Sequence, residues 1–172
     1  QFLRDHPHEV VLLDFNHLYC MPSRADHCQL QRIVGRHLGA RMAGPEMGLD
    51  VTYGNMRAAG RQVVAFYLPS AALPRAAEQW DRRFWPHDRR HICTPWPRAT
   101  SVETLRPHIR HHTDHNAERE ATFFVLQAVL TPVAKTVARG LVLPPHNLCQ
   151  MAAPVTPFLE EEVIRDLAPR RL

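Results

Sequence analysis

Lysine is almost absent from this chain. Lys135 is the only one, and the other 20 of the 21 Lys and Arg residues are arginine. The arginine fork matches the geometry of phosphate oxygens, so this usage favours an anionic ligand, but base composition of the coding DNA is the simpler explanation. The net charge of +4 is small and dispersed along the chain, so we expect no nucleic-acid partner.

Long apolar runs and cysteine frameworks are also missing. No stretch reaches the ~18 consecutive apolar residues of a membrane span, so the sequence predicts no transmembrane segment. Gln1 stands at the first position and no secretory leader follows, which indicates a fragment or a processed chain. The 4 cysteines form no CxxC pair, so we expect free thiols in a reducing compartment and a cytoplasmic location.

Three apolar runs predict buried strands at about 9–15, 62–67 and 122–130. The first, "EVVLLDF", is continuous rather than alternating, which favours burial on both faces, as in a parallel sheet covered by helices. Between them, residues 24–38 place their apolar side chains on one helical face, and a further helix is expected from Ser101. Strands that alternate with helices predict an α/β fold with a parallel sheet or barrel.

Polar side chains gather where the predicted strands end, which is where parallel α/β folds bind ligands. Asn16 and His17 can hydrogen-bond to a polyol or a phosphate, and His17 could transfer protons near neutral pH. The alternative is a hydrogen-bond network that only holds the rim of the sheet. Asp14 still belongs to the strand, which favours a structural role such as a pair with an arginine. Tyr67 ends the second strand and offers a hydroxyl group.

Residues 71–101 are rich in proline and tryptophan and predict a long ordered loop, a kind of segment that often carries function. Within "TPWPRATS", the Trp96 indole could stack on a sugar ring and Arg98 could meet a phosphate. The competing interpretation is a loop anchored by a buried indole. We predict one shared substrate-binding cavity for the residues Asn16, His17, Tyr67, Trp96 and Arg98.

The stretch "RPHIRHHTDHN" concentrates histidine. Its i, i+4 spacings, His108 with His112 and His111 with His115, could hold a metal on a helix. No cysteine accompanies them, no glutamate stands in the zinc-protease position, and the surroundings are polar and rich in arginine. We therefore interpret it as a solvated segment and predict neither a metal site nor a cofactor.

Four stretches together resemble the phosphatidylinositol-specific phospholipase C X-domain-containing proteins, in order from about residue 1 to 141. They are "FLRDHPHEVVLLDFNHLYCM", "RQVVAFYLP", "TPWPRATSVETL" and "FFVLQAVLTPVAKTVARGL". The resemblance implies part of a TIM-type barrel over residues 1–141 and a phosphoric diester hydrolase of the phospholipase C class. It also implies a phosphatidylinositol-type lipid headgroup as partner, met peripherally at a membrane surface.

In that family two histidines act as base and acid, and they precede the stretch that resembles "EVVLLDF". None of the 12 histidines here matches either motif, so the resemblance assigns no catalytic residue and we expect this chain alone to be inactive. The alternative function is a non-catalytic module that binds inositol phosphate or another protein. Residues 142–172 depart from the family and predict a divergent tail with a short helix that carries Leu159, Val163 and Leu167.

Overall fold

The computed structural model describes residues 1–114, 122–134, 138 and 148–165. The chain forms two compact units, Gln1–Cys93 with Glu120–Phe123, and Thr94–Arg119 with Phe124–Leu172. Each unit buries hydrophobic clusters of its own. Among the described residues no helix is both long enough and apolar enough to cross a membrane.

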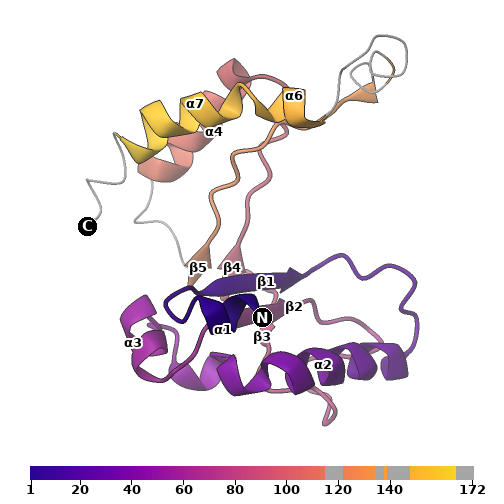
Figure 1. Ribbon diagram of the computed structural model, residues 1–172. Helices are drawn as coiled ribbons and strands as arrows, with labels where there is room; N and C mark the ends of the chain where they lie inside the picture. Colours follow the sequence, from indigo (N-terminus) through magenta and orange to yellow (C-terminus); the bar gives the residue numbers. More distant parts are fainter. Residues whose placement is uncertain (115–121, 135–137, 139–147, 166–172) are drawn as a thin grey trace. The chain divides into compact units, whose positions relative to one another are not determined.

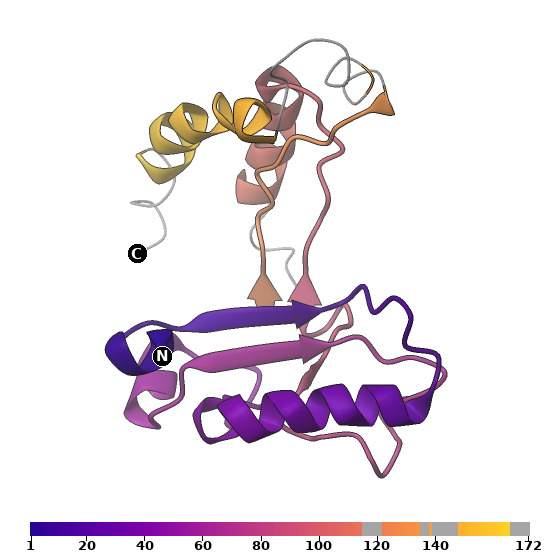
Figure 2. The ribbon, with the colours of Figure 1, turned by 45° about the vertical axis from the view of Figure 1, so that its right-hand side comes forward.

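The first unit holds a parallel sheet with helices around it (Figures 1 and 2). The sheet runs in the order β1–β2–β3, and both pairings are parallel. Along the chain, the elements of this unit are α1 (Phe2–Asp5), β1 (Val11–Phe15), α2 (Arg24–Leu38), the 3₁₀ turns η1 (Gly39–Arg41) and η2 (Pro45–Met47), α3 (Tyr53–Ala58), β2 (Val63–Tyr67), β3 (Trp85–Pro86) and β4 (Ile92–Cys93). The predicted parallel α/β architecture is confirmed at this level, and its closure into part of a barrel stays a prediction.

Strand β2 is central, and all five of its residues are buried. Because successive strand side chains point to opposite faces, its odd-numbered residues pack on one face and its even-numbered residues on the other. The first face meets α2 through a cluster of Met42, Val63, Ala65, Tyr67, Leu73, Trp80 and Phe84. The second face builds a separate cluster of Ala43, Met56, Val64, Phe66, Trp85 and Ile92.

Helix α2 has a well-defined beginning and a closely packed end. Ser23 caps its first turn in a capping box with Asp26, which satisfies two backbone N–H groups at the helix start. Near its other end the Arg83 guanidinium donates to the Gly35 carbonyl oxygen over 3.2 Å. A Cβ atom at Gly35 or Gly39 would collide with that guanidinium, so both glycines permit the close approach. Arg83 therefore ties the β2–β3 connection to α2.

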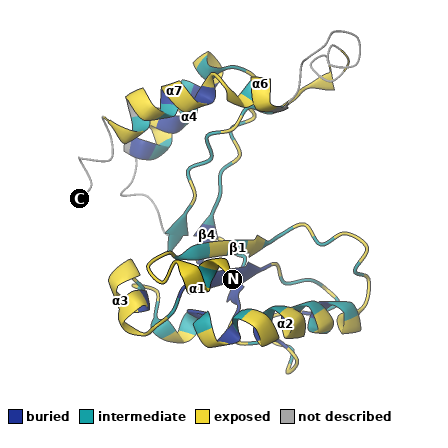
Figure 3. Ribbon diagram, in the orientation of Figure 1, coloured by how far each residue is buried: buried dark blue, intermediate teal, exposed yellow. Residues whose placement is uncertain are grey.

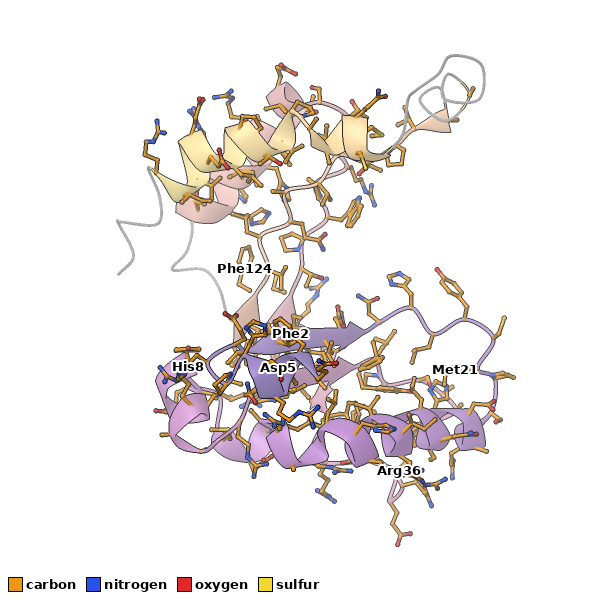
Figure 4. The ribbon with its side chains drawn as sticks, viewed as in Figure 1. Phe2, Asp5, His8, Met21, Arg36 and Phe124 are labelled. Carbon is orange, nitrogen blue, oxygen red and sulfur yellow. The ribbon has the colours of Figure 1, made fainter. Side chains whose placement is uncertain are left out.

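The side chains of buried Gln62 and exposed Tyr53 fix the turn that leads into β1. The Gln62 amide, which is buried, donates to the backbone oxygens of His6 and Glu9. The Tyr53 hydroxyl donates to the His8 carbonyl oxygen over 2.6 Å, and His8 lies beside α3 in Figure 4. These contacts hold the turn before β1 against α3 and the start of β2.

The regular structure described in the second unit is mainly helical, and irregular segments join the helices. Its elements are α4 (Val102–Asp114), α6 (Leu148–Ala152), α7 (Val155–Phe158) and the π-helical segment η4 (Leu159–Ile164). Ser101 accepts from the Thr104 backbone N–H over 3.3 Å, as expected for the start of α4. The core contains Ala99, Leu105, Ile109, Val155 and Phe158. Figure 3 shows buried positions on both α4 and α7.

The predicted third strand at 122–130 was wrong beyond its first residues. Strand β5 covers only Phe123–Phe124 and pairs with β4. After it, Leu126, Ala128 and Leu130 pack against the α4–α7 core instead of joining a sheet, so hydrophobic burial wins over strand pairing there. The proposed boundary at residue 141 falls in 139–147, outside the described residues, so the division into 1–141 and 142–172 stays a prediction.

Candidate functional site

The carboxyl end of the parallel sheet carries a connected chain of polar side chains. The Asp14 carboxylate meets Nδ1 of His87 at 2.6 Å through one oxygen. Its other oxygen accepts from the Asn16 amide over 2.7 Å. The Asn16 oxygen in turn bonds Nδ1 of His17. We call this chain, His87–Asp14–Asn16–His17, the strand-end network.

Register explains how residues so far apart in the sequence meet. Asp14 pairs with Phe66 across β1 and β2, on the face of the sheet opposite α2. The backbone N–H of His87 donates to the Tyr67 carbonyl oxygen over 2.9 Å, immediately after β3 ends. Three consecutive parallel strands thus end at one edge, and the first and third of them supply the network.

The hydrogen bonds fix which ring nitrogens carry protons. A carboxylate only accepts, so Nδ1 of His87 is a donor, and the Asn16 amide group that faces Asp14 is the NH₂. The Asn16 oxygen then accepts, which makes Nδ1 of His17 a donor as well. No hydrogen bond to Nε2 of either ring is present in the part of the chain that the structure describes. Each neutral imidazole can therefore offer Nε2 to a hydroxyl group of a ligand.

Tyr67, predicted to contact substrate, lies elsewhere. Its side chain is fully buried on the α2 face, and its hydroxyl meets Nδ1 of His27 at 2.8 Å. Burial raises the pKa of Tyr67 to about 12, with a smaller contribution from Cys28. The structure therefore brings Asn16 and His17 together at the sheet edge and places Tyr67 on the opposite face.

Trp96 and Arg98 belong to the second unit. The Trp96 indole N–H donates to the Thr131 hydroxyl over 2.9 Å, and 54% of the residue remains exposed. Arg98 is exposed and has a left-handed backbone, with φ of 49°. The indole is thus held by its N–H edge, while more than half of the residue stays exposed. A cavity shared by the five predicted residues stays a prediction.

The histidine-rich stretch forms part of α4. The rings of His108 and His112 lie 4.6 Å apart between centroids, and those of His111 and His112 lie 5.0 Å apart. Burial lowers the pKa of His108. A hydrogen bond between its ring and the Pro95 backbone acts in the opposite direction but does not cancel the effect of burial. Within residues 1–114, 122–134 and 148–165 no three metal-ligating side chains converge.

Sequence reasoning missed His87, and it assigned Asp14 a different partner. Asp14 pairs with a histidine and not with an arginine. The available signal was the stretch "FWPHD", where two aromatic residues and a proline precede polar residues. The second strand likewise ends in two aromatic residues with a proline soon after, "FYLP". A strand of two residues gives no periodicity, so this signal was indistinguishable from an ordinary turn.

Known proteins align with most of this chain. PI-PLC X domain-containing protein 2 of Mus musculus is 34% identical over 141 residues, which is 82% of this chain and 38% of that protein. The Homo sapiens protein 2 is 33% identical over 141 residues, 82% of this chain and 43% of that protein. PI-PLC X domain-containing protein 3 of Mus musculus is 31% identical over 140 residues, 81% of this chain and 40% of that protein.

Over this stretch the chain belongs to the family of PI-PLC X domain-containing proteins. It spans about two fifths of the length of these curated PI-PLC X domain-containing relatives. No family model and no solved structure matches the chain. The suspected family is therefore confirmed by the relatives, while the activity of the whole protein is a matter for proposal.

Proposed function

We propose that this chain supplies the headgroup-binding part of a phosphoric diester hydrolase of the phosphatidylinositol phospholipase C class. The strand-end network binds the inositol phosphate group, and the protein meets its lipid peripherally at a membrane surface from the cytoplasm. The observation that carries the proposal is the hydrogen-bonded chain His87–Asp14–Asn16–His17 at the carboxyl end of a parallel sheet. Membership of the PI-PLC X domain-containing family supports the class of ligand.

The chemistry of the network suits a polyol. Vicinal ring hydroxyls both donate and accept, and the two Nε2 atoms accept while the remaining amide proton of Asn16 donates. The Asp14 carboxylate holds His87 in one tautomer and one orientation, which reduces the entropy lost when a ligand binds. The Asp14 and His87 side chains are 26% and 20% exposed, so the network is reachable from solvent yet held in place.

A second function, a binding module without catalysis, is favoured by one observation. None of the 12 histidines matches a catalytic motif of the family in sequence. Where the module binds inositol phosphate, the two functions differ only in turnover. Acid–base groups typically contribute ~10²–10⁴-fold in rate, so their absence would leave binding intact and hydrolysis undetected.

Calorimetric titration of the purified chain with myo-inositol 1-phosphate tests the binding. Asn16→Ala removes the link between Asp14 and His17, and we expect about tenfold weaker binding, because a hydrogen bond to a charged or polar ligand contributes about 1–2 kcal/mol. His37→Ala, which removes an exposed imidazole from α2, serves as the matched control and should leave affinity unchanged. Equal affinity in the Asn16→Ala chain would contradict the proposed site.

Release of inositol phosphate from phosphatidylinositol vesicles tests the turnover. We expect none from the isolated chain above a heat-denatured blank. Turnover that His17→Ala abolishes would make His17 a catalytic residue and would favour the hydrolase over the binding module. Turnover that survives His17→Ala and is lost on heating would show that the acid–base group lies at another position of this chain.

A further inference from the structure

The connection between β2 and β4 is rich in arginine, and only some of these arginines pair closely with its carboxylates. Asp81 bonds Arg83 through both of its oxygens, at 2.9 and 2.5 Å. Partial burial would raise the pKa of Asp81, but the hydrogen bonds and charge of Arg83 outweigh it and hold that pKa below its usual value. The Asp81 carboxylate is therefore already neutralised by one arginine.

Asp88 is similarly committed. Its Oδ1 meets Nδ1 of His91 at 2.6 Å, and His91 is buried. Burial alone would raise the pKa of Asp88. The hydrogen bonds from His91 and from backbone N–H groups outweigh burial, so the pKa of Asp88 lies below its usual value. Arg75 approaches its other oxygen only at 4.0 Å, with 57% of the Arg75 side chain exposed. Among the described residues, this contact leaves the Arg75 guanidinium without an acceptor closer than 4.0 Å.

Arg82 differs from its neighbour Arg83. It is exposed, and no ion pair or side-chain hydrogen bond of Arg82 occurs within the described residues. Glu78, the third carboxylate of the connection, forms no ion pair with Arg75 or Arg82 there either. Two guanidinium groups of this loop thus keep unused donors.

Both of these arginines line the same cavity. It has a volume of about 110 Å³, and its lining residues are Pro45, Arg75, Ala77, Trp80, Arg82, Phe84 and Pro86. A single water needs only about 10–15 Å³ of such free space, so the cavity has room for a tetrahedral anion. Trp80 and Phe84 are buried members of the α2-facing cluster, so they form a rigid apolar wall that excludes solvent from one side.

We propose that this arginine-lined cavity, which we call the Arg75–Arg82 pocket, binds a phosphate group. Arginine forks bond phosphate oxygens in pairs, and a low-dielectric aromatic wall strengthens such bonds. The pocket uses the α2 face of the sheet, whereas the strand-end network uses the opposite face, so the two are separate sites of the first unit. The phosphate belongs either to a soluble phosphomonoester or to an anionic phospholipid at a membrane surface.

Two titrations of the purified chain identify the ligand and its source. In the first, inorganic phosphate is added at constant ionic strength, and the indole N–H resonance of Trp80 is followed by NMR. In the second, the chain is sedimented with phosphatidylcholine vesicles with and without about one fifth phosphatidic acid. Each is repeated with Arg75→Gln/Arg82→Gln and with the control Arg89→Gln, which removes one exposed charge outside the pocket.

We expect phosphate to shift the Trp80 resonance in a saturable manner, and the double variant to bind at least tenfold more weakly, while Arg89→Gln binds as the parent does. Vesicle binding that requires phosphatidic acid and is lost in the double variant would assign the pocket to a lipid. Phosphate binding without vesicle binding would assign it to a soluble ligand. Absence of both, or an equal loss in Arg89→Gln, would overturn the proposal.

Discussion

Strands β1 and β2 are neighbours of equal length and similar composition, yet they differ in burial. In β2, "VVAFY", every residue is buried, while in β1, "VLLDF", burial alternates and Leu12 is 47% exposed. The difference comes from position in the sheet, because β2 lies between two strands and β1 pairs only with β2 in the described part of the chain. An apolar run in the sequence therefore indicates a strand. How much of that strand is buried depends on the strands that pair with it in the sheet.

The same contrast separates the hydrophobic core from the candidate site. The central strand supplies side chains to both hydrophobic clusters of the first unit. The outer strand leaves one face open near its end, and there it places Asp14, the residue that joins both histidines of the strand-end network. A polar group costs little where water still reaches it, so a partly exposed strand can carry unpaired polar atoms at a lower free-energy cost than a fully buried one.

The largest expected effect is in the central strand. Phe66→Ala removes a fully buried ring that stacks edge to face on Phe123, with centroids 5.1 Å apart, and should lower the free energy of unfolding by about 3–5 kcal/mol. Leu12→Ala, the matched change in β1, should cost under about 1 kcal/mol. Urea denaturation of both variants measures the difference between the two losses in free energy of unfolding. Equal losses would contradict the distinction between the two strands.

Tyr67→Phe should have an intermediate effect. It leaves Nδ1 of the buried His27 without its partner, at an expected cost of about 1–3 kcal/mol. The folded-state pKa of Tyr67 is about 12, above the ordinary value of 10.0. The unfolded chain therefore loses this proton first, so the stability from neutral Tyr67 is complete below pH 10 and is lost as pH rises through 12.

Denaturation midpoints at pH 8 to 12 check this dependence. The parent chain should lose up to about 1.4 kcal/mol per pH unit from this group above pH 10, and Tyr67→Phe should lack that component. An identical alkaline decline in both chains would mean that Tyr67 ionises as it would in water.

The smallest effect on stability is expected at the open face of β1. We expect the isolated chain to bind a hydrophobic dye and to self-associate, because Leu12 and the unpaired side of β1 are accessible. Leu12→Lys should reduce dye binding and association while it changes the free energy of unfolding by under about 1 kcal/mol. A parent chain that is monomeric and does not bind dye would show that β1 is already covered.

Much of the first unit could be predicted from the sequence, because its elements are long enough to show a period. The prediction for α2 agrees with Arg24–Leu38, and those for β1 and β2 differ from the structure by no more than two residues at the start. Strands β3 and β4, of two residues each, lie inside the segment interpreted as a loop. Only tertiary contacts define these two strands, and the local hydrophobic pattern of the sequence does not predict such contacts.

The candidate site was predictable only in part, for the same reason. Asn16 and His17 follow a strand that the sequence reveals, whereas His87 follows one that it does not. Tyr67 also stands at a strand end, but its pairing with Phe15 in register places it on the α2 face. Register is a property of two strands together, so the face that Tyr67 occupies could not be derived from its own run.

The most direct test of the account follows the imidazoles of His17 and His87 by NMR while myo-inositol 1-phosphate is added. Because one network joins them through Asp14 and Asn16, both sets of ring resonances should move together and give one dissociation constant. Asn16→Ala should weaken that constant and uncouple the two rings, while His37→Ala should change neither. Resonances that stay fixed, or a response of one ring alone, would contradict a shared headgroup site at the carboxyl end of the sheet.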